Sequence, residues 1–263
     1  MWCLLLLYLT LSGVQAYASV SGVVSTLAGG GNTTLLGEDY PASGFADGTG
    51  ELAQFSSPAG ALVSYQGTKV YVADASNNKI RTVVVSTGAV TTLAGGGKDL
   101  SESGHTDGTG TDYGNLFHHP SALAITQTSN ILYVADTLNN KIRKVIAQIG
   151  LTTESSTVGV TTSLVGGGST GGTGTYAGFN GPYGLALNAD DTVLYVADYG
   201  NHMVRKVTIA TSIVVTMCGG VEGLADGIGT AAEMGGPSGL VMSADFTMLY
   251  VAEATSNRVR ALG

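Results

Sequence analysis

The strongest constraint on this 263-residue chain is a tract that occurs four times. Each copy consists of an aliphatic residue, Tyr, Val, Ala and an acidic residue, and the copies align on Tyr71, Tyr133, Tyr195 and Tyr250. A proline lies 13 residues before each tyrosine and an arginine 10 residues after it: Pro58, Pro120, Pro182 and Pro237, with Arg81, Arg143, Arg205 and Arg260. The tyrosines are 62, 62 and 55 residues apart. This spacing predicts one supersecondary unit repeated four times.

The composition favours an all-β chain. Hydrophobic residues make up 44%, charged residues only 11%, and there are 40 glycines. In the second copy, alternation and turn residues predict four strands at 121–126, 131–135, 141–147 and 160–165. Four-stranded units in tandem predict the blades of a β-propeller.

The repeat itself resembles a known family. Tyr-Val-Ala-Asp, then Asn and Ile-Arg, preceded by Phe-x-x-Pro, is similar to the NHL repeat of β-propellers, and the resemblance covers nearly all of the chain after residue 16. The third copy departs by having His202 and Met203, and the fourth by having Glu253. The resemblance implies a propeller, but NHL proteins include binding scaffolds, RNA readers, cell-surface modules and a few lyases, so it implies no single function.

The two ends of the repeat array are complementary. Residues 257–262 complete a third strand, while residues 23–30 match a fourth strand and its glycine tail. We therefore predict four NHL-type blades in a ring that the N-terminal strand closes by completing the last blade. The alternative is an open piece of a larger propeller.

The first residues are typical of an export signal. An apolar run at residues 4–11, followed by Val-Gln-Ala at 14–16, predicts a signal peptide over residues 1–16 and a propeller domain over 17–263. An uncleaved membrane anchor stays open. The predicted location is extracellular, with Asn32 as a glycosylation acceptor. Cys218 then remains as the single cysteine, at a position expected to be buried.

Loops alternate between the two ends of a strand meander, so the turns between second and third strands and the connections between blades must share one face. We predict structural roles, in turn capping or ion pairing, for the acidic and arginine residues of the repeat: Asp74, Arg81, Asp136, Arg143, Asp198, Arg205, Glu253 and Arg260. The net charge of -8 disfavours a nucleic-acid partner.

Candidate binding residues lie on the same face, in the loops: His105, Asp107, Asp112, His118, His119 and His202. Their spacings match no metal motif, and Asp107 with Asp112 supplies few of the about six to eight oxygens that calcium takes. We predict no cofactor, while zinc and calcium stay open. The predicted function is a monomeric, secreted scaffold that binds a protein or glycan; the alternative is a metal-dependent lyase or lactonase-like enzyme.

Overall fold

The computed structural model describes residues 24–30, 32–35, 38–41, 43–96, 102–111, 115–148, 158–168 and 172–263. The predicted signal peptide and Asp112 lie outside these residues. Asn32 begins the first strand, and its glycosylation stays a prediction. In the described part of the chain, no helix is long and apolar enough to cross a membrane.

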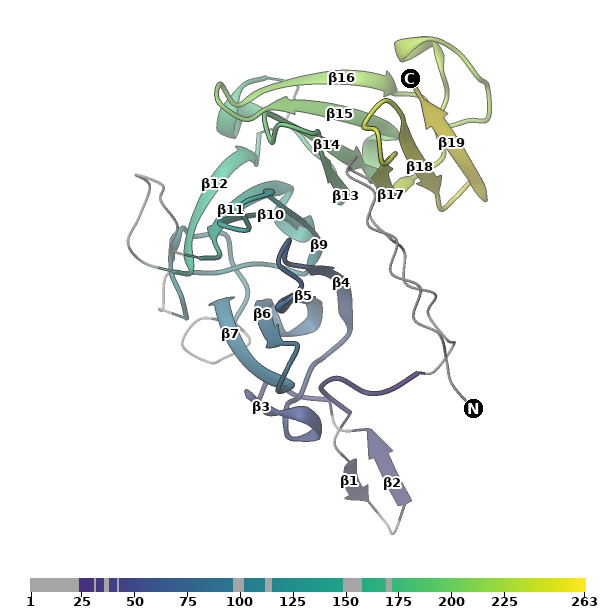
Figure 1. The fold of residues 1–263 in the computed structure, drawn as a ribbon. Coiled ribbons are helices and arrows are strands. Elements are labelled where there is room, and N and C mark those ends of the chain that lie inside the picture. Colours follow the sequence, from purple (N-terminus) through teal and green to yellow (C-terminus); the bar gives the residue numbers. More distant parts are fainter. Residues whose placement is uncertain are drawn as a thin grey trace, which may run out of the picture.

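The described residues form four β-sheet blades, as predicted (Figure 1). Blade 1 contains β4 (Pro58–Val63), β5 (Lys69–Asp74), β6 (Lys79–Val84) and β7 (Ala89–Gly95). Blade 2 contains β9 (Pro120–Ile125), β10 (Ile131–Asp136), β11 (Lys141–Ile146) and β12 (Val160–Gly166). Blade 3 contains β13 (Pro182–Leu187), β14 (Val193–Asp198), β15 (Met203–Thr208) and β16 (Ile213–Gly219). Blade 4 contains β17 (Pro237–Met242), β18 (Leu249–Glu253) and β19 (Arg258–Leu262).

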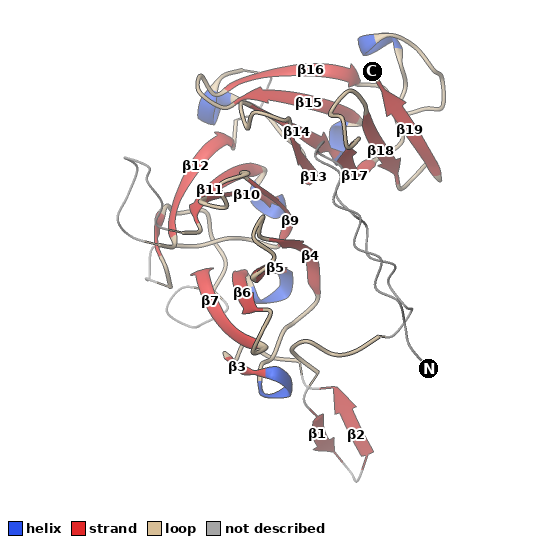
Figure 2. Ribbon diagram, in the orientation of Figure 1, coloured by secondary structure: helices blue, strands red, loops and turns tan. Residues whose placement is uncertain are grey.

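Short elements join and extend the blades (Figure 2). A hairpin of β1 (Asn32–Leu35) and β2 (Glu38–Pro41) precedes blade 1, while β3 (Gly48–Thr49) and β8 (Gly108–Thr109) pair with the outer strands β7 and β12. The 3-10 turns are η1 (Gly50–Leu52), η2 (Ala75–Asn77), η3 (Thr137–Asn139), η4 (Gly174–Tyr176), η5 (Tyr199–Asn201) and η6 (Gly229–Ala231).

The strands predicted for blade 2 are confirmed to within one residue at each end. They form because Val, Ile and Tyr favour pleated, half-buried surfaces and because turn residues separate them. Successive strands pair antiparallel, with Tyr133 opposite Ala124 on one side and Lys144 on the other. This meander places every turn between second and third strands at the same end of its blade.

The hydrophobic core lies between neighbouring blades. One cluster joins Tyr71 of blade 1 to Leu132 of blade 2, with Phe117 between the two strands in sequence. Similar clusters join blade 2 to blade 3 and blade 3 to blade 4. Burial of each large apolar side chain contributes about 1.5–3 kcal/mol. The blades therefore hold their neighbours through face-to-face packing.

The predicted closing strand pair is not formed. Residues 24–30 lie against blade 1, where the Gly29 amide donates to the Gly50 carbonyl at 3.0 Å. Among the described residues, β19 pairs with β18 alone. Figure 1 shows the four blades as an open arc.

Candidate functional site

The candidate site is the turn face, which we define as the turns at residues 74–78, 136–140, 198–202 and 253–257 with the connections between blades. In blade 2, Asp136 ends β10 and Asn140 adopts a left-handed conformation with φ 54°. Asparagine tolerates that conformation better than most residues. This conformation reverses the chain direction within a short turn, so that β11 pairs antiparallel with β10.

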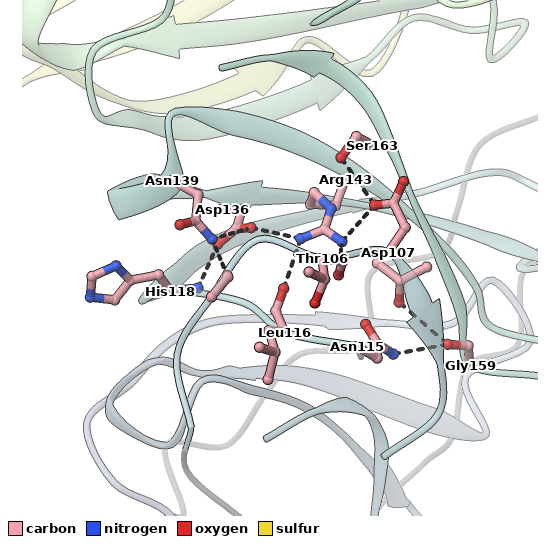
Figure 3. A network of polar contacts seen from close by, with 12 residues as sticks. Thr106, Asp107, Asn115, Leu116, His118, Asp136, Asn139, Arg143, Gly159 and Ser163 are labelled. Atoms are coloured by element: carbon pink, nitrogen blue, oxygen red, sulfur yellow. Dashed lines mark hydrogen bonds and ion pairs between the residues drawn. The ribbon is translucent and has the colours of Figure 1, made fainter. Parts of the chain in front are cut away.

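The carboxylate of Asp136 organises this turn (Figure 3). Its Oδ1 accepts the His118 amide at 2.7 Å, and its Oδ2 accepts the Asn139 amide group at 2.8 Å and Arg143 Nη1 at 3.0 Å. Asp136 and Arg143 are both fully buried. Burial raises the pKa of Asp136, and the hydrogen bond from the His118 amide and the arginine charge oppose that shift.

Arg143 links the turn to the preceding connection. Its Nη1 donates to the Leu116 carbonyl at 2.8 Å, and its Nη2 donates to Thr106 O and Asp107 Oδ1, both at 2.8 Å. The guanidinium also lies 5.1 Å from the ring centroid of Phe117. Asp107 in turn accepts Ser163 Oγ of the outer strand at 3.0 Å. One arginine thus connects a strand, a turn and a long loop.

The ion pair of the turn occurs in every blade. Acidic and arginine residues of the repeat form the ion pairs Asp74–Arg81 (2.8 Å), Asp136–Arg143 (3.0 Å), Asp198–Arg205 (3.2 Å) and Glu253–Arg260 (3.3 Å). Arg81 and Arg260 also reach the loop carboxylates of Asp47 and Asp226. Burial raises the pKa of Asp198 as it does that of Asp136. The charged groups of the repeat are thus engaged within the blades.

The histidines occupy different environments. His105 and Asp107 are exposed in the connection between blades 1 and 2. His118 and His119 use their backbone amides, which donate to Asp136 and to Asn78 Oδ1, and the imidazole of His118 points away from the network (Figure 3). Of the residues that the structure describes, no three His, Cys, Asp or Glu side chains are close enough to hold a metal ion.

His202 takes a place in the frame. It has the left-handed φ of 55° that Asn has in blades 1 and 2, and its Nδ1 accepts the Gly236 amide at 3.3 Å. Its Nε2 lies 3.9 Å from Glu222 Oε2. The structure therefore does not gather the six predicted binding residues into one cluster among its described residues, and Asp112 lies outside them.

A surface on the turn face of blade 3 escaped the sequence prediction. The rings of Tyr183 and Tyr199 have centroids 6.3 Å apart at an interplanar angle of 46°. Tyr183 is exposed, Tyr199 is half-buried, and Leu138 in the neighbouring turn is 56% exposed. We call these three residues the tyrosine patch. Tyr183 interrupts the repeat, because the residues after Pro58, Pro120 and Pro237 are Ala59, Ser121 and Ser238.

Buried hydroxyl groups fix the tyrosine patch from below. Thr137 Oγ1 donates to the Pro182 carbonyl at 2.9 Å, and Ser121 Oγ donates to the Tyr183 carbonyl at 3.1 Å. The two hydroxyl oxygens also lie 2.6 Å apart, so one hydroxyl divides its single proton between the other hydroxyl and its carbonyl partner. These contacts hold η3 beside the start of β13, so that Leu138 and Tyr183 emerge from one rigid joint.

The amino-acid sequence of this chain is similar to those of curated NHL-repeat proteins. No family model matches the chain. NHL repeat-containing protein 2 of Bos taurus is 31% identical over 198 residues, and that of Homo sapiens is 32% identical over 197 residues; both alignments cover 73% of this chain. The chain spans 25% of the length of each relative.

Similar solved structures show the same fold. An auxiliary nutrient binding protein from Bacteroides ovatus has a TM-score of 0.61 at 18% identity, covering 81% of this chain and 49% of that one. A nidogen/laminin complex has a TM-score of 0.54 at 13% identity, covering 88% and 68%. The repeat, the four blades with their ion pairs between an acidic residue and arginine, and the curated relatives together establish that this chain belongs to the NHL-repeat β-propeller family.

Proposed function

We propose that this propeller is a secreted binding scaffold whose turn face engages a protein or glycan outside the cell, with the tyrosine patch at the centre of the contact. The tyrosine patch is the single observation that carries the proposal. Two tyrosine rings lie on the turn face of blade 3, and buried hydroxyls of blade 2 fix the start of β13, which carries Tyr183, beside the turn that carries the exposed Leu138. Such rigid amphipathic side chains bury large area with little loss of conformational entropy, and aromatic residues dominate binding energy at interfaces.

The frame supports binding because the ion pairs of the repeat are already formed. Asp136 and Arg143 bond to each other, to Asn139 of the turn and to two loop carbonyls, which fixes the turn without a partner. A preformed face loses less conformational entropy on binding than a mobile one. Two similar structures are described as auxiliary nutrient binding proteins, and one is a complex of nidogen with laminin. These similar folds support the proposal that this chain also uses a propeller face for binding.

Binding is tested with the purified full chain on a glycan array and on an array of extracellular proteins. Tyr183→Ala and Tyr199→Ala should each weaken the strongest signal at least tenfold, which corresponds to about 1.4 kcal/mol. The matched control is Tyr65→Ala, since Tyr65 is 61% exposed but lies between first and second strands, at the other end of blade 1. Equal loss in all three variants, or no loss in the first two, would count against the proposal.

Export and the enzymatic alternative have separate tests. Expression in a secretory host, with mass analysis of the N-terminus of protein recovered from the medium, checks cleavage after residue 16. For the lyase or lactonase-like alternative, His118 is the observation to follow, because its imidazole points away from the frame (Figure 3). If the chain binds zinc or calcium in a one-to-one ratio, and His118→Ala or His119→Ala abolishes that binding, the result would contradict a scaffold without a metal site and favour the enzymatic alternative.

A further inference from the structure

The arginine of each repeat holds its guanidinium group in the same pose. In every blade Nη1 donates to the acidic residue that ends the second strand and to a backbone carbonyl 27 residues earlier in the chain. In blades 1 to 3 a phenylalanine ring also lies beside the guanidinium, with its centroid at 5.1, 5.1 and 5.6 Å. Because the guanidinium is planar, these contacts direct Nη2 the same way in each blade.

In three blades a carboxylate of the preceding connection meets Nη2. These ion pairs are Arg81–Asp47 (2.8 Å), Arg143–Asp107 (2.8 Å) and Arg260–Asp226 (2.6 Å). In blade 1 the outer strand completes the set of donors, because Thr92 donates its hydroxyl to Asp47 Oδ1 at 3.0 Å and its amide to Oδ2 at 3.1 Å. In blade 2 the hydroxyl of Ser163 takes the same part.

Blade 3 has the arginine of this set without the carboxylate. Alignment of residues 170–174 with residues 106–110 places Gly171 where blade 2 has Asp107, and residues 166–181 contain no Asp or Glu. Residues 169–171, which are Ser, Thr and Gly, lie outside the described residues. Arg205 Nη1 keeps its bonds to Asp198 and to Gly178 O, both at 3.2 Å, whereas Nη2 has no acceptor among the residues that the structure describes.

The burial of Arg205 makes this unpaired donor costly. Its side chain is only 5% exposed. A buried donor without an acceptor loses its hydrogen bonds to water and gains none in return. An acceptor that reached Nη2 would therefore recover part of that free energy.

Thr216 supplies the outer-strand donors in blade 3. It lies opposite Arg205 in the pairing of β15 with β16, as Thr92 lies opposite Arg81 in blade 1. The amide of Val214, two residues earlier, donates to the connection at 3.3 Å, so the Thr216 amide faces the connection as well. In the described part of blade 3, that amide has no carboxylate to donate to.

The hydroxyl of Thr216 has only a weak acceptor. It lies 3.5 Å from Met203 Sδ, and Arg205 Nη1 lies 3.6 Å from the same sulfur. A thioether is a weak acceptor, and the flexible methionine side chain can move aside. The hydroxyl is therefore available to a stronger acceptor.

The charge balance of blade 3 favours an anion at this place. The arginines of the other three blades each pair with two carboxylates, whereas Arg205 pairs with Asp198 alone among the described residues. The place is open to solvent on one side, because the carboxylates that fill it in blades 1 and 2, Asp47 and Asp107, are 48% and 46% exposed. A carboxylate from outside the chain can therefore reach it.

We propose that Arg205 Nη2 and the hydroxyl and amide of Thr216 form a carboxylate-binding site, and that its occupant is an aspartate side chain of a partner protein. The occupant follows from its chemistry, since the same three donors bind Asp47 in blade 1. Hydrogen bonds from a guanidinium to a carboxylate are among the strong ones in proteins. The site borders the connection of blade 3 on the turn face, so it rests on the proposed function and narrows the partner to an acidic protein segment.

The probe is N-acetyl-aspartate methylamide, whose side chain is its single carboxylate. In an NMR titration of the isotope-labelled full chain, the amide signal of Thr216 should shift and saturate with one equivalent bound. The matching asparagine derivative should bind about tenfold more weakly, because it offers no charge to Arg205. Thr216→Val keeps the amide and should weaken aspartate binding about fivefold. Ser163→Ala, the matched change in blade 2, should leave that binding unchanged.

Two further variants move the carboxylate. Gly171→Asp supplies blade 3 with the side chain that the other blades have, so it should abolish aspartate binding and raise the melting temperature. Asp47→Gly removes the carboxylate of blade 1 and should create a second site, with two equivalents bound. No saturable shift in the wild type, or a shift that persists in Gly171→Asp, would overturn the proposal. Equal affinity for methyl glucuronide would overturn the aspartate occupant.

The protein array separates this inference from the proposed function. If Tyr183→Ala abolishes a protein signal that Gly171→Asp retains, and the aspartate probe does not bind, the carboxylate site is wrong and the turn-face scaffold stands. If the probe binds to Arg205 and Thr216 but no array signal depends on Tyr183, the scaffold proposal fails and an aspartate side chain of a partner is no longer its occupant.

Discussion

Asp136 and Arg143 form an ion pair of 3.0 Å in which both side chains are fully buried. The pair stands at the centre of a network that includes the His118 amide, Asn139 and two carbonyl groups. Burying two charges is costly, and the surrounding hydrogen bonds offset that cost. The pair therefore ties the turn face to the blade beneath it, and removal of one partner has a consequence that can be measured.

Arg143→Leu should lower the free energy of unfolding by about 3–5 kcal/mol, because it leaves the Asp136 carboxylate buried without its counter-ion. Replacement of both partners, in Asp136→Asn with Arg143→Leu, should cost less than the sum of the single changes. Chemical denaturation monitored by circular dichroism measures both. The control Lys206→Met, at a half-buried position with no ion pair among the described residues, should stay within about 0.5 kcal/mol of wild type.

Phe117→Ala should destabilise the joint of blades 1 and 2 by about 3–5 kcal/mol. The ring is fully buried, packs against Gly95 and lies under the Arg143 guanidinium. Phe117→Leu keeps most of the volume and should recover much of the loss. The same denaturation experiment measures the series, and equal stability of the Ala and Leu variants would contradict the packing explanation.

Gly184→Ala should destabilise the chain by about 1–3 kcal/mol through overpacking. The new methyl group would lie 2.4 Å from Ser238 O, and neither the β13 backbone nor the facing blade can move away without loss of packing. Ala122 is the natural residue at the matching position of blade 2, so Ala122→Gly serves as the reverse change and should cost about 0.5–1 kcal/mol. A Gly184→Ala chain that melts with wild-type stability would contradict the close approach.

The fold was predictable because its determinants recur at fixed spacing. Pro120, Tyr133 and Arg143 each have three counterparts, so strands, turns and blade limits could be aligned against one another before any contact was known. The ring closure was harder. The complementarity of residues 24–30 and blade 4 was visible in the sequence. The angle between neighbouring blades, however, depends on how side chains pack at three joints, and the repeat pattern does not determine that packing.

The site was less predictable for a related reason. The histidines were candidates because imidazole can bind metals and transfer protons. Two of them instead stabilise the frame, His119 through its backbone amide and His202 through its imidazole Nδ1. Tyr183 carried a signal of a different kind, since it departs from the Ala and Ser of its counterparts after the repeat proline. Comparison of copies for where they differ, on the face where loops gather, would have found the tyrosine patch.

Thr192→Val should raise the pKa of Asp190 toward its ordinary value of 3.8. In the folded chain the Thr192 hydroxyl donates to Asp190 Oδ1 at 2.6 Å, and with the Thr192 amide it holds the pKa of that carboxyl below the ordinary value. A carboxyl whose folded pKa is lowered stabilises the fold fully above its unfolded pKa, and this contribution is lost as the pH falls toward the folded value. The variant should therefore differ from wild type less in acid than at neutral pH.

Carboxyl NMR titration measures the Asp190 pKa directly, and thermal melts at neutral and acid pH measure the linked stability. Thr211→Val is the matched control, because Thr211 is exposed in the turn between β15 and β16 of the same blade, and among the described residues its hydroxyl bonds to no carboxylate. An Asp190 pKa that stays low in Thr192→Val would show that the backbone amides alone hold the carboxylate, since that variant keeps the Thr192 amide and removes only its hydroxyl.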